Sequence, residues 1–199
     1  MPENGIKTFC PASREQWRAW LQEQHDKEKS VWLIFYKNKS NVPTITWSDA
    51  VDEAICFGWI DSIVKPVDDE KFMRLFSRRK VKSVWSAINK AKVQKLLDEK
   101  LITPAGLESI NTAKQNGSWT ILDNSEALII PDDMEKELKK WPNAKNNFIT
   151  WSKTDKKNVL QWIVLAKRPD TRQKRIKEIV ELADQNLKPS VIRWKKARD

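Results

Sequence analysis

Hydrophobic positions in the N-terminal part of the chain repeat with two different periods. In "SREQWRAWLQEQ" they have helical spacing, with Trp17, Trp20 and Leu21 on one face and Ser13 as the expected N-cap. The next run, "SVWLIFYKN", is rich in β-branched and aromatic residues, which is typical of a strand. Helical spacing returns in "TITWSDAVDEAICF", where we expect Ser48 to cap a helix that Gly58 ends or bends.

The pattern from residue 59 to residue 79 predicts a β-hairpin. The segments "WIDSIVKPV" and "KFMRLFSRR" both alternate imperfectly, and the second places Phe72, Arg74 and Phe76 on one side. The acidic residues 68–70 between the segments fit a tight turn. The chain from residue 31 to residue 79 is therefore predicted to form a strand, a helix and a hairpin.

Beyond this hairpin the pattern is helical. Thr103, Pro104 and Gly117 stand where a helix would begin and end, and Ser152 and Asp155 are spaced like a capping box. A narrow apolar stripe marks the last long helix and consists of Ile176, Ile179, Val180 and Ala183.

The fold class that follows is α+β, with a small N-terminal β-sheet with helices, followed by a helix-rich C-terminal part. We expect three regions. Residues 1–82 form an α/β region with the small sheet, residues 83–125 form a helical hairpin and connection, and residues 126–199 form a C-terminal helical region. The eleven Trp residues predict a core dominated by tryptophan.

The charge of +10 is concentrated in two basic blocks. Residues 65–100 hold 11 basic and 5 acidic side chains, and residues 151–199 hold 14 and 6. Such a distribution attracts anionic small molecules or polyanions, and it is also compatible with an ordinary solvated surface.

Several classes of protein are not supported by the sequence. Two cysteines without CxxC spacing, no signal-peptide pattern and no long apolar run predict a cytoplasmic protein without membrane insertion. Nucleotide-binding glycine loops, zinc-hydrolase motifs and serine-hydrolase motifs are absent. His25 is the only histidine, and it lies in a polar stretch. The sequence therefore indicates no metal site and no cofactor, and it leaves the oligomeric state open.

The first candidate site is Asp61 with Lys65. In an extended strand they would lie on the same face about 13 Å apart, at roughly 3.3 Å per residue. Both could point into one cleft, where Asp61 would act as a general base and Lys65 as an electrophilic group. Both could equally face water as the charged side of a strand.

The second candidate site is "SRRKVKSVWSAIN", residues 77–89. Four cations, Arg78, Arg79, Lys80 and Lys82, precede an expected helix start, and helix N-termini and arginines both favour anions. Trp85 would supply a flat surface, and Ser86 and Asn89 would share a helix face. The alternative is a solvated basic turn.

The third candidate is the basic run "LAKRPDTRQKRIKE" around the start of the last long helix. It could contact nucleic-acid phosphates, with an affinity that falls in salt. Basic residues at a helix N-terminus oppose the helix dipole, however, so an intramolecular match with Asp170 or with Glu residues of the N-terminal half is the alternative.

Two motifs resemble the YdeI/OmpD-associated family, whose members are also called bacteriocin-protection proteins. The first is "FGWIDS" followed by Trp85-Ser86 and Asn89, and the second is "AKRP" followed by "TR" and "RI". The resemblance spans about residues 31–188, and in the family pattern a Pro often replaces Arg78, which makes Arg79 the better match. It implies a link to resistance against peptide antibiotics and association with a porin, and it implies no particular reaction.

The function expected from these observations is that of a cytoplasmic bacterial protein that binds an anionic small molecule. An enzyme that uses Asp61 and Lys65 and a nucleic-acid-binding protein are the alternatives. The predicted ligand-binding residues are Trp59, Asp61, Lys65, Arg79, Ser83, Trp85, Ser86 and Asn89.

Overall fold

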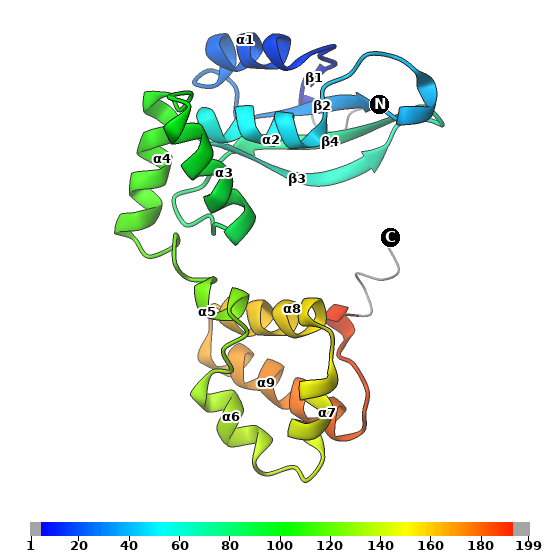
Figure 1. Cartoon of the computed structure of the whole chain (residues 1–199), viewed down its shortest axis with the longest axis vertical. Helices are drawn as coiled ribbons and strands as arrows, with labels where there is room; N and C mark the ends of the chain where they lie inside the picture. Colours follow the sequence, from blue (N-terminus) through cyan, green and yellow to red (C-terminus); the bar gives the residue numbers. More distant parts are fainter. Residues whose placement is uncertain (1–4, 193–199) are drawn as a thin grey trace. The chain divides into compact units, whose positions relative to one another are not determined.

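The computed structural model describes residues 5–192, which fall into two compact units (Figure 1). The first unit comprises Met1–Val84 and Ile88–Trp119, and the second comprises Trp85–Ala87 and Thr120–Asp199. A mixed sheet occupies the first unit and the second is helical, so the predicted α+β class is confirmed.

The sheet of the first unit has four strands in the order β1-β2-β4-β3. They are β1 (Thr8–Phe9), β2 (Ser30–Tyr36), β3 (Trp59–Pro66) and β4 (Lys71–Arg78). β1 is parallel to β2, whereas β4 is antiparallel to both β2 and β3. The predicted strand and hairpin are therefore confirmed, and the hairpin inserts β4 into the middle of the sheet.

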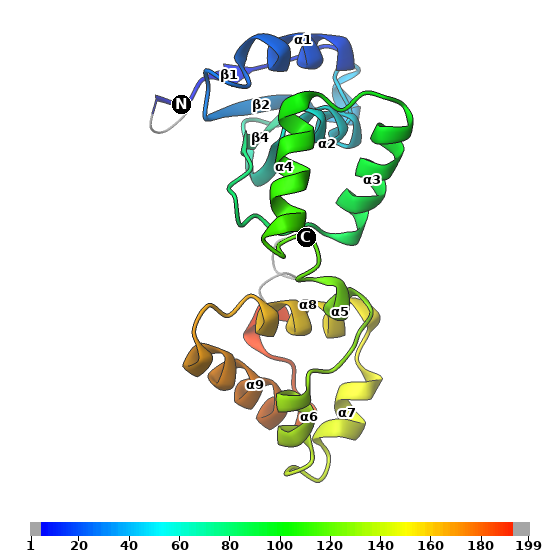
Figure 2. The same ribbon diagram turned by 90° about the vertical axis from the view of Figure 1, so that its left-hand side faces the viewer.

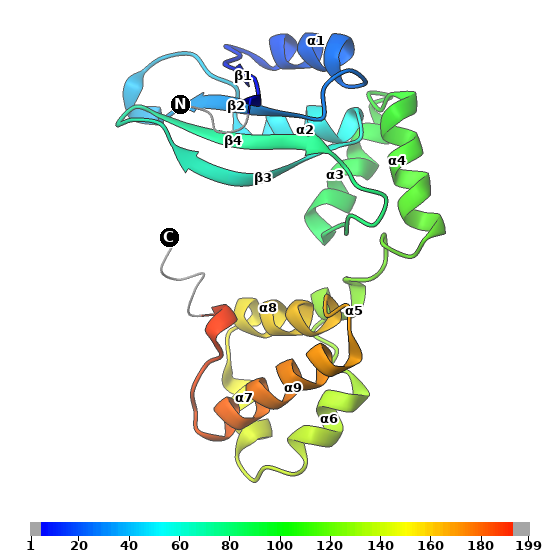
Figure 3. The ribbon, with the colours of Figure 1, turned by 180° about the vertical axis from the view of Figure 1, so that it is seen from behind.

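One face of this sheet is covered by helices. The helices of the first unit are α1 (Arg14–Gln24), α2 (Trp47–Cys56), α3 (Ala87–Asp98) and α4 (Pro104–Gln115), with a short 3₁₀ turn at Asn38–Ser40. Helix α2 lies in front of the strands in Figure 1 and behind them in Figure 3, which places it against a single face.

The core between the sheet and α1 and α2 is rich in tryptophan, as predicted. Trp17 and Trp59 are 0% exposed, and the Trp17 ring lies 5.5 Å from that of Phe76. Phe35 of β2 stacks on Phe72 of β4 at 5.1 Å. Since Phe72 and Phe76 are both even-numbered positions of β4, the even positions of this strand point toward the helices.

The helix boundaries follow local capping chemistry. Ser13 and Thr103 cap α1 and α4 as predicted. The prediction for α2 is wrong by two residues, because Thr46 and not Ser48 accepts a hydrogen bond from the Asp49 amide. Gly58 ends that helix in the left-handed conformation with φ of 72°, as its position indicated.

Within the described residues, the second unit is built from the helices α5 (Asp123–Glu126), α6 (Asp132–Leu138), α7 (Ala144–Thr150), α8 (Lys153–Val164) and α9 (Pro169–Asp184). Figure 2 shows α6, α7 and α8 around α9, with which all three are in contact. The predicted stripe of α9 is buried in the core, and Ser152 caps α8 as expected. Across residues 5–192 no helix is long and apolar enough to span a bilayer.

Candidate anion-binding site

A bulge in β3 separates the two residues of the first candidate site. The register pairs Asp61 with Phe76 and Lys65 with Met73, and it shifts between Asp61 and Val64. Phe76 and Met73 are an odd number of residues apart, so they point to opposite faces of the sheet. The prediction that Asp61 and Lys65 share a face is therefore wrong, and the proposed pairing of the two in one cleft is lost.

Asp61 belongs instead to the helix-covered face, where it is held by two donors. Arg74 donates to its Oδ2 atom at 2.7 Å, and the Trp47 indole N–H donates to the same oxygen at 3.0 Å. The Arg74 guanidinium also lies over the Trp47 ring, 4.7 Å from its centroid. This arrangement makes Asp61 an ion-pair partner and orients Arg74.

Arg79 directly follows the last residue of β4, and its side chain lies within electrostatic range of Asp61. Its amide donates to the Gly58 carbonyl at 2.9 Å, and its Nη1 donates to the Val84 carbonyl at 3.3 Å. Burial of the guanidinium lowers the pKa of Arg79 to about 10, and the nearby charge of Asp61 opposes that shift. A buried cation beside a carboxylate that already binds another arginine is an electrostatically costly arrangement.

Lys92 of α3 adds a third cation near α2. Its Nζ atom donates to the Ser48 hydroxyl at 2.8 Å and forms an ion pair with Asp52, whose side chain is 8% exposed. Asn89 lies three residues before Lys92 and therefore on the same side of α3. Ser48, the residue predicted as a helix cap, thus serves as a contact between α2 and α3.

We call Arg74, Arg79 and Lys92, together with Asp52 and Asp61, the cationic cluster. All five belong to the first unit. Arg74 pairs with Asp61 and Lys92 pairs with Asp52, and the set of three basic and two acidic side chains has a formal net charge of +1. Such an excess favours a bound anion.

The other predicted site residues have different surroundings. Trp59 is a core residue that donates to the His25 carbonyl at 3.3 Å, and the Ser83 hydroxyl accepts from the Lys80 amide at 3.0 Å. Trp85 and Ser86 are grouped with the second unit. The structure therefore places Arg79 within electrostatic range of Asp61, and it places Lys65 on the other face of the sheet.

Arg74, Trp47 and Lys92 were not among the predicted site residues. Arg74 could have been identified from the sequence pattern of β4, because it lies between Phe72 and Phe76 on a strand face whose neighbouring positions are apolar. A cation at such a position requires a buried anion or a ligand. No sequence pattern identifies Lys92 as a site residue, since its partners are set by the packing of α3 on α2.

Two arginines of the basic run have partners within the second unit. At 2.6 and 2.8 Å, Arg172 binds both oxygens of Asp133, an acidic residue outside the groups that the sequence suggested for this run. The Arg175 guanidinium stacks on the Trp162 ring at 4.9 Å and donates to the Trp162 carbonyl at 2.5 Å. These two arginines of the second motif have structural roles in joining α6, α8 and α9.

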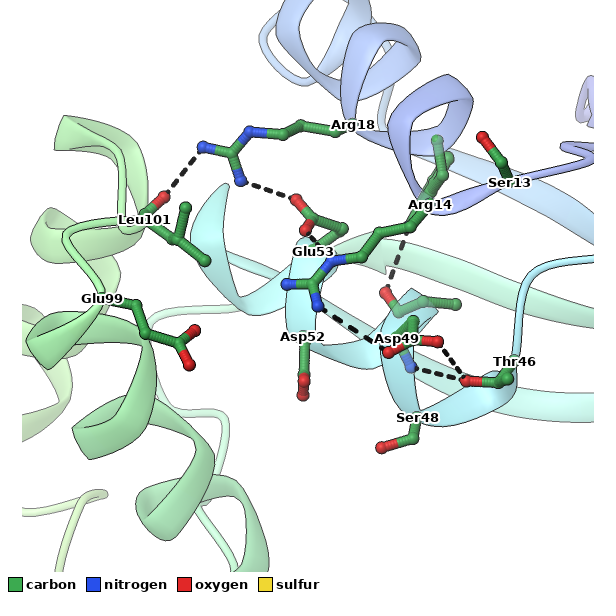
Figure 4. A network of polar contacts seen from close by, with 12 residues as sticks. Ser13, Arg14, Arg18, Thr46, Ser48, Asp49, Asp52, Glu53, Glu99 and Leu101 are labelled. Atoms are coloured by element: carbon green, nitrogen blue, oxygen red, sulfur yellow. Dashed lines mark hydrogen bonds and ion pairs between the residues drawn. The ribbon is translucent and has the colours of Figure 1, made fainter.

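A second buried carboxylate, Glu53, belongs to a structural network and not to the cationic cluster. Arg14 and Arg18 of α1 hold its two oxygens at 2.5 and 2.7 Å (Figure 4). Arg18 also donates to the Leu101 carbonyl at 3.0 Å. In the part of the chain that the structure describes, no three histidine, cysteine or acidic side chains are arranged to hold a metal ion.

Fold and site together define an α+β unit with a cationic cluster, followed in the chain by a helical unit. Two family models match the chain, one in each unit. Residues 9–109 match the family described as "Domain of unknown function (DUF8412)", and because this match spans just over half of the chain, the chain belongs to that family. Residues 127–186 match the family described as "Bacteriocin-protection, YdeI or OmpD-Associated", which confirms the predicted resemblance over these residues.

The "FGWIDS" motif lies within the first of these two matches. No curated protein and no solved structure shows significant similarity to the chain.

Proposed function

We propose that the first unit binds a small anion at the cationic cluster, with Arg79 as its principal contact. The observation that carries this proposal is the burial of the Arg79 guanidinium next to Asp61, a carboxylate that Arg74 already engages. A phosphate or carboxylate would bring negative charge to a set of side chains whose formal net charge is +1. A planar guanidinium binds either group through two parallel hydrogen bonds.

The neighbours of Arg79 have separate roles in this proposal. Asp61 and Trp47 hold Arg74 in one orientation, which reduces the entropy lost when a ligand binds. Lys92 approaches from α3, and Asn89 on the same side of that helix adds a hydrogen-bonding amide. The expected ligand is therefore small and carries at least one phosphate or carboxylate group.

Thermal unfolding in inorganic phosphate and in pyrophosphate tests the proposal, with KCl used to keep the ionic strength constant. Bound phosphate raises the unfolding free energy by about 2.7 kcal/mol when its concentration is 100 times Kd. We expect a rise in Tm for the wild type and none for Arg79→Gln. Arg78→Gln is the matched control, because Arg78 is exposed and donates to the Glu28 carbonyl.

Both variants remove one positive charge from adjacent positions, so any difference between them reports the site and not the overall charge. The proposal fails if phosphate and pyrophosphate leave the wild-type Tm unchanged. It also fails if Arg79→Gln keeps the full shift, or if Arg78→Gln loses as much of it.

We further propose that the protein contributes to protection against bacteriocins from within the cytoplasm. The match of residues 127–186 to the bacteriocin-protection family supports the phenotype, and two unpaired cysteines are compatible with a reducing compartment. A net charge of +10 would repel cationic peptides, so capture of such a peptide is a poor mechanism. Protection would instead depend on the anionic ligand.

Deletion of the gene should lower survival in the presence of a bacteriocin, and the wild-type gene should restore it. Arg79→Gln should fail to restore survival although the protein accumulates normally, whereas Arg78→Gln should succeed. Cell fractionation should recover the protein with cytoplasmic markers. Full rescue by Arg79→Gln would separate the phenotype from the anion site and contradict this mechanism.

A further inference from the structure

The face of the sheet opposite α1 and α2 carries a set of side chains that the anion site does not use. In Figure 3 the strands lie in front of α2, and no helix of the described part of the first unit lies in front of them. We call this surface the open sheet face. It consists of Trp32, Ile34, Tyr36, Lys65, Lys71, Met73 and Leu75.

Two lysines on this face lie over two aromatic rings. The Nζ atom of Lys65 is 5.3 Å from the Trp32 centroid, and that of Lys71 is 5.3 Å from the Tyr36 centroid. β4 separates β3 from β2 in the sheet, so the Lys65 side chain must cross β4 to reach Trp32. Its methylene chain therefore lies along the surface of the sheet.

The remaining residues of the open sheet face are apolar. Ile34, Met73 and Leu75 are half-buried, and the face as defined contains no aspartate or glutamate. Trp32 and Tyr36 are four residues apart on β2, which places their Cα atoms about 13 Å from each other. The surface thus combines two separated rings, two cations and an apolar floor.

We propose that the open sheet face binds single-stranded nucleic acid. Bases stack on aromatic rings irrespective of sequence, and nearby lysines contact the phosphates. Trp32 is only 4% exposed, so a base would reach its ring when Lys65 moves aside and its ammonium group takes up a phosphate. Tyr36 and Lys71 would hold a second nucleotide in the same way.

The charges on this face argue against a second copy of the chain as the occupant. A two-fold symmetric dimer would press this patch against its own copy, so two lysines from each chain would share one interface to which this face contributes no acidic residue. Like charges across an interface are unfavourable. An anionic strand with flat bases matches both the rings and the lysines.

Fluorescence anisotropy with labelled oligo-dT and oligo-U of about 12 nucleotides tests this proposal. We expect binding to both strands that weakens with salt, because each lysine–phosphate contact adds roughly −0.7 to the slope of log K against log salt. Lys65→Gln and Lys71→Gln should each reduce the slope by about that amount. Tyr36→Leu, which keeps an apolar side chain, should weaken binding about tenfold with the salt slope unchanged.

Lys95→Gln is the control, because Lys95 is an exposed lysine of α3 far from β2 in sequence and paired with Glu99. It should bind both oligonucleotides like the wild type. Preference for oligo-U over oligo-dT would identify RNA as the ligand.

Three results would overturn the proposal. The first is no binding of either oligonucleotide at about 50 mM salt. The second is a loss of affinity in Lys95→Gln as large as that in Lys65→Gln. The third is an affinity for a duplex of the same length equal to that for the single strand. Light scattering supplies a further check. A dimer that dissociates in Lys65→Gln or Tyr36→Leu would assign the open sheet face to self-association instead.

Discussion

Arg18 and Glu53 form an ion pair in which only the arginine reaches the surface. The side chain of Arg18 is 27% exposed and that of Glu53 is 2% exposed, with 2.7 Å between Nη1 and Oε2. Arg14 binds the other carboxylate oxygen, so α1 covers a buried charge of α2 with two guanidinium groups (Figure 4). A buried carboxylate is tolerated when its partners satisfy it and is costly when they are removed.

Removal of both arginines should therefore destabilise the first unit strongly. We expect Arg14→Met/Arg18→Met to lower the unfolding free energy by about 3–5 kcal/mol, because Glu53 would remain buried without a cation. Adding Glu53→Leu to this double variant should recover most of the loss, since the buried charge is then gone. Urea denaturation followed by circular dichroism measures both effects.

The exposed pair between Lys7 and Glu28 provides the comparison, because its lysine is 69% exposed. Lys7→Gln should change the unfolding free energy by less than about 1 kcal/mol. If the triple variant were no more stable than the double variant, the loss would come from the missing side-chain packing of the arginines. The explanation by an unpaired buried charge would then be wrong.

Gly106 should not tolerate a side chain. A Cβ atom at this position would collide with the Cys56 carbonyl oxygen and would lie 2.9 Å from that of Ile55, where α4 crosses the end of α2. Gly106→Ala should cost about 1–3 kcal/mol or more, although alanine is the better helix former. Gly117→Ala tests backbone strain without a collision, because an added Cβ would meet open space there while φ is 79°. This substitution should lower the unfolding free energy by about 1 kcal/mol. Thermal unfolding compares the two variants, and a Gly106→Ala protein as stable as the wild type would contradict this contact.

Local chemistry was sufficient to predict much of the fold. The caps at Ser13, Thr103 and Ser152 each satisfy a helix amide close in sequence, so they could be located from residue type and spacing. The cap of α2 was ambiguous, because Thr46 and Ser48 are both good capping residues two positions apart. The insertion of β4 between β2 and β3 depends on long-range pairing, which no local pattern specifies.

The arrangement of the candidate site was harder to predict, because it depends on a single β-bulge in β3. The bulge between Asp61 and Val64 moves Lys65 to the other face, and it exists only in relation to the partner strand β4. The electrostatic proximity of Arg79 to Asp61 could be suspected from the motif, but the role of Arg74 required knowledge of which strand face is covered.

The two cysteines should differ sharply in reactivity. Burial, with a smaller contribution from the Glu53 charge, raises the pKa of Cys56 to about 11, whereas Cys10 is exposed. At about pH 8 only about one Cys56 thiol in a thousand would be ionised. Iodoacetamide should therefore modify Cys10 first in the native protein and both cysteines in urea, as peptide mass spectrometry can measure. Equal native rates would show that Cys56 is accessible and ionised.

The raised pKa of Cys56 should also make the folded state less stable at alkaline pH. The thiol of Cys56 stays protonated in the folded state above its unfolded pKa of 9.0, so folding should weaken as the pH rises from about 9 to about 11. Cys56→Ala should show a shallower decline over this range, measured as the unfolding free energy in urea. An identical decline in both proteins would assign the alkaline loss to other groups.

Acid stability should depend on the pair between Asp133 and Arg172 in the second unit. Hydrogen bonds from Arg172 lower the pKa of Asp133 below its usual 3.8, so the folded state favours the ionised carboxylate. The stabilisation is present above the unfolded pKa and is lost as the pH falls through the lower folded value. We therefore expect wild-type stability to fall below about pH 4. Asp133→Asn should be less stable at about pH 7 and should approach the wild type near about pH 2, because protonation removes the same charge from both. If the gap between the two proteins stayed constant over this range, this ion pair would not be the source of the difference.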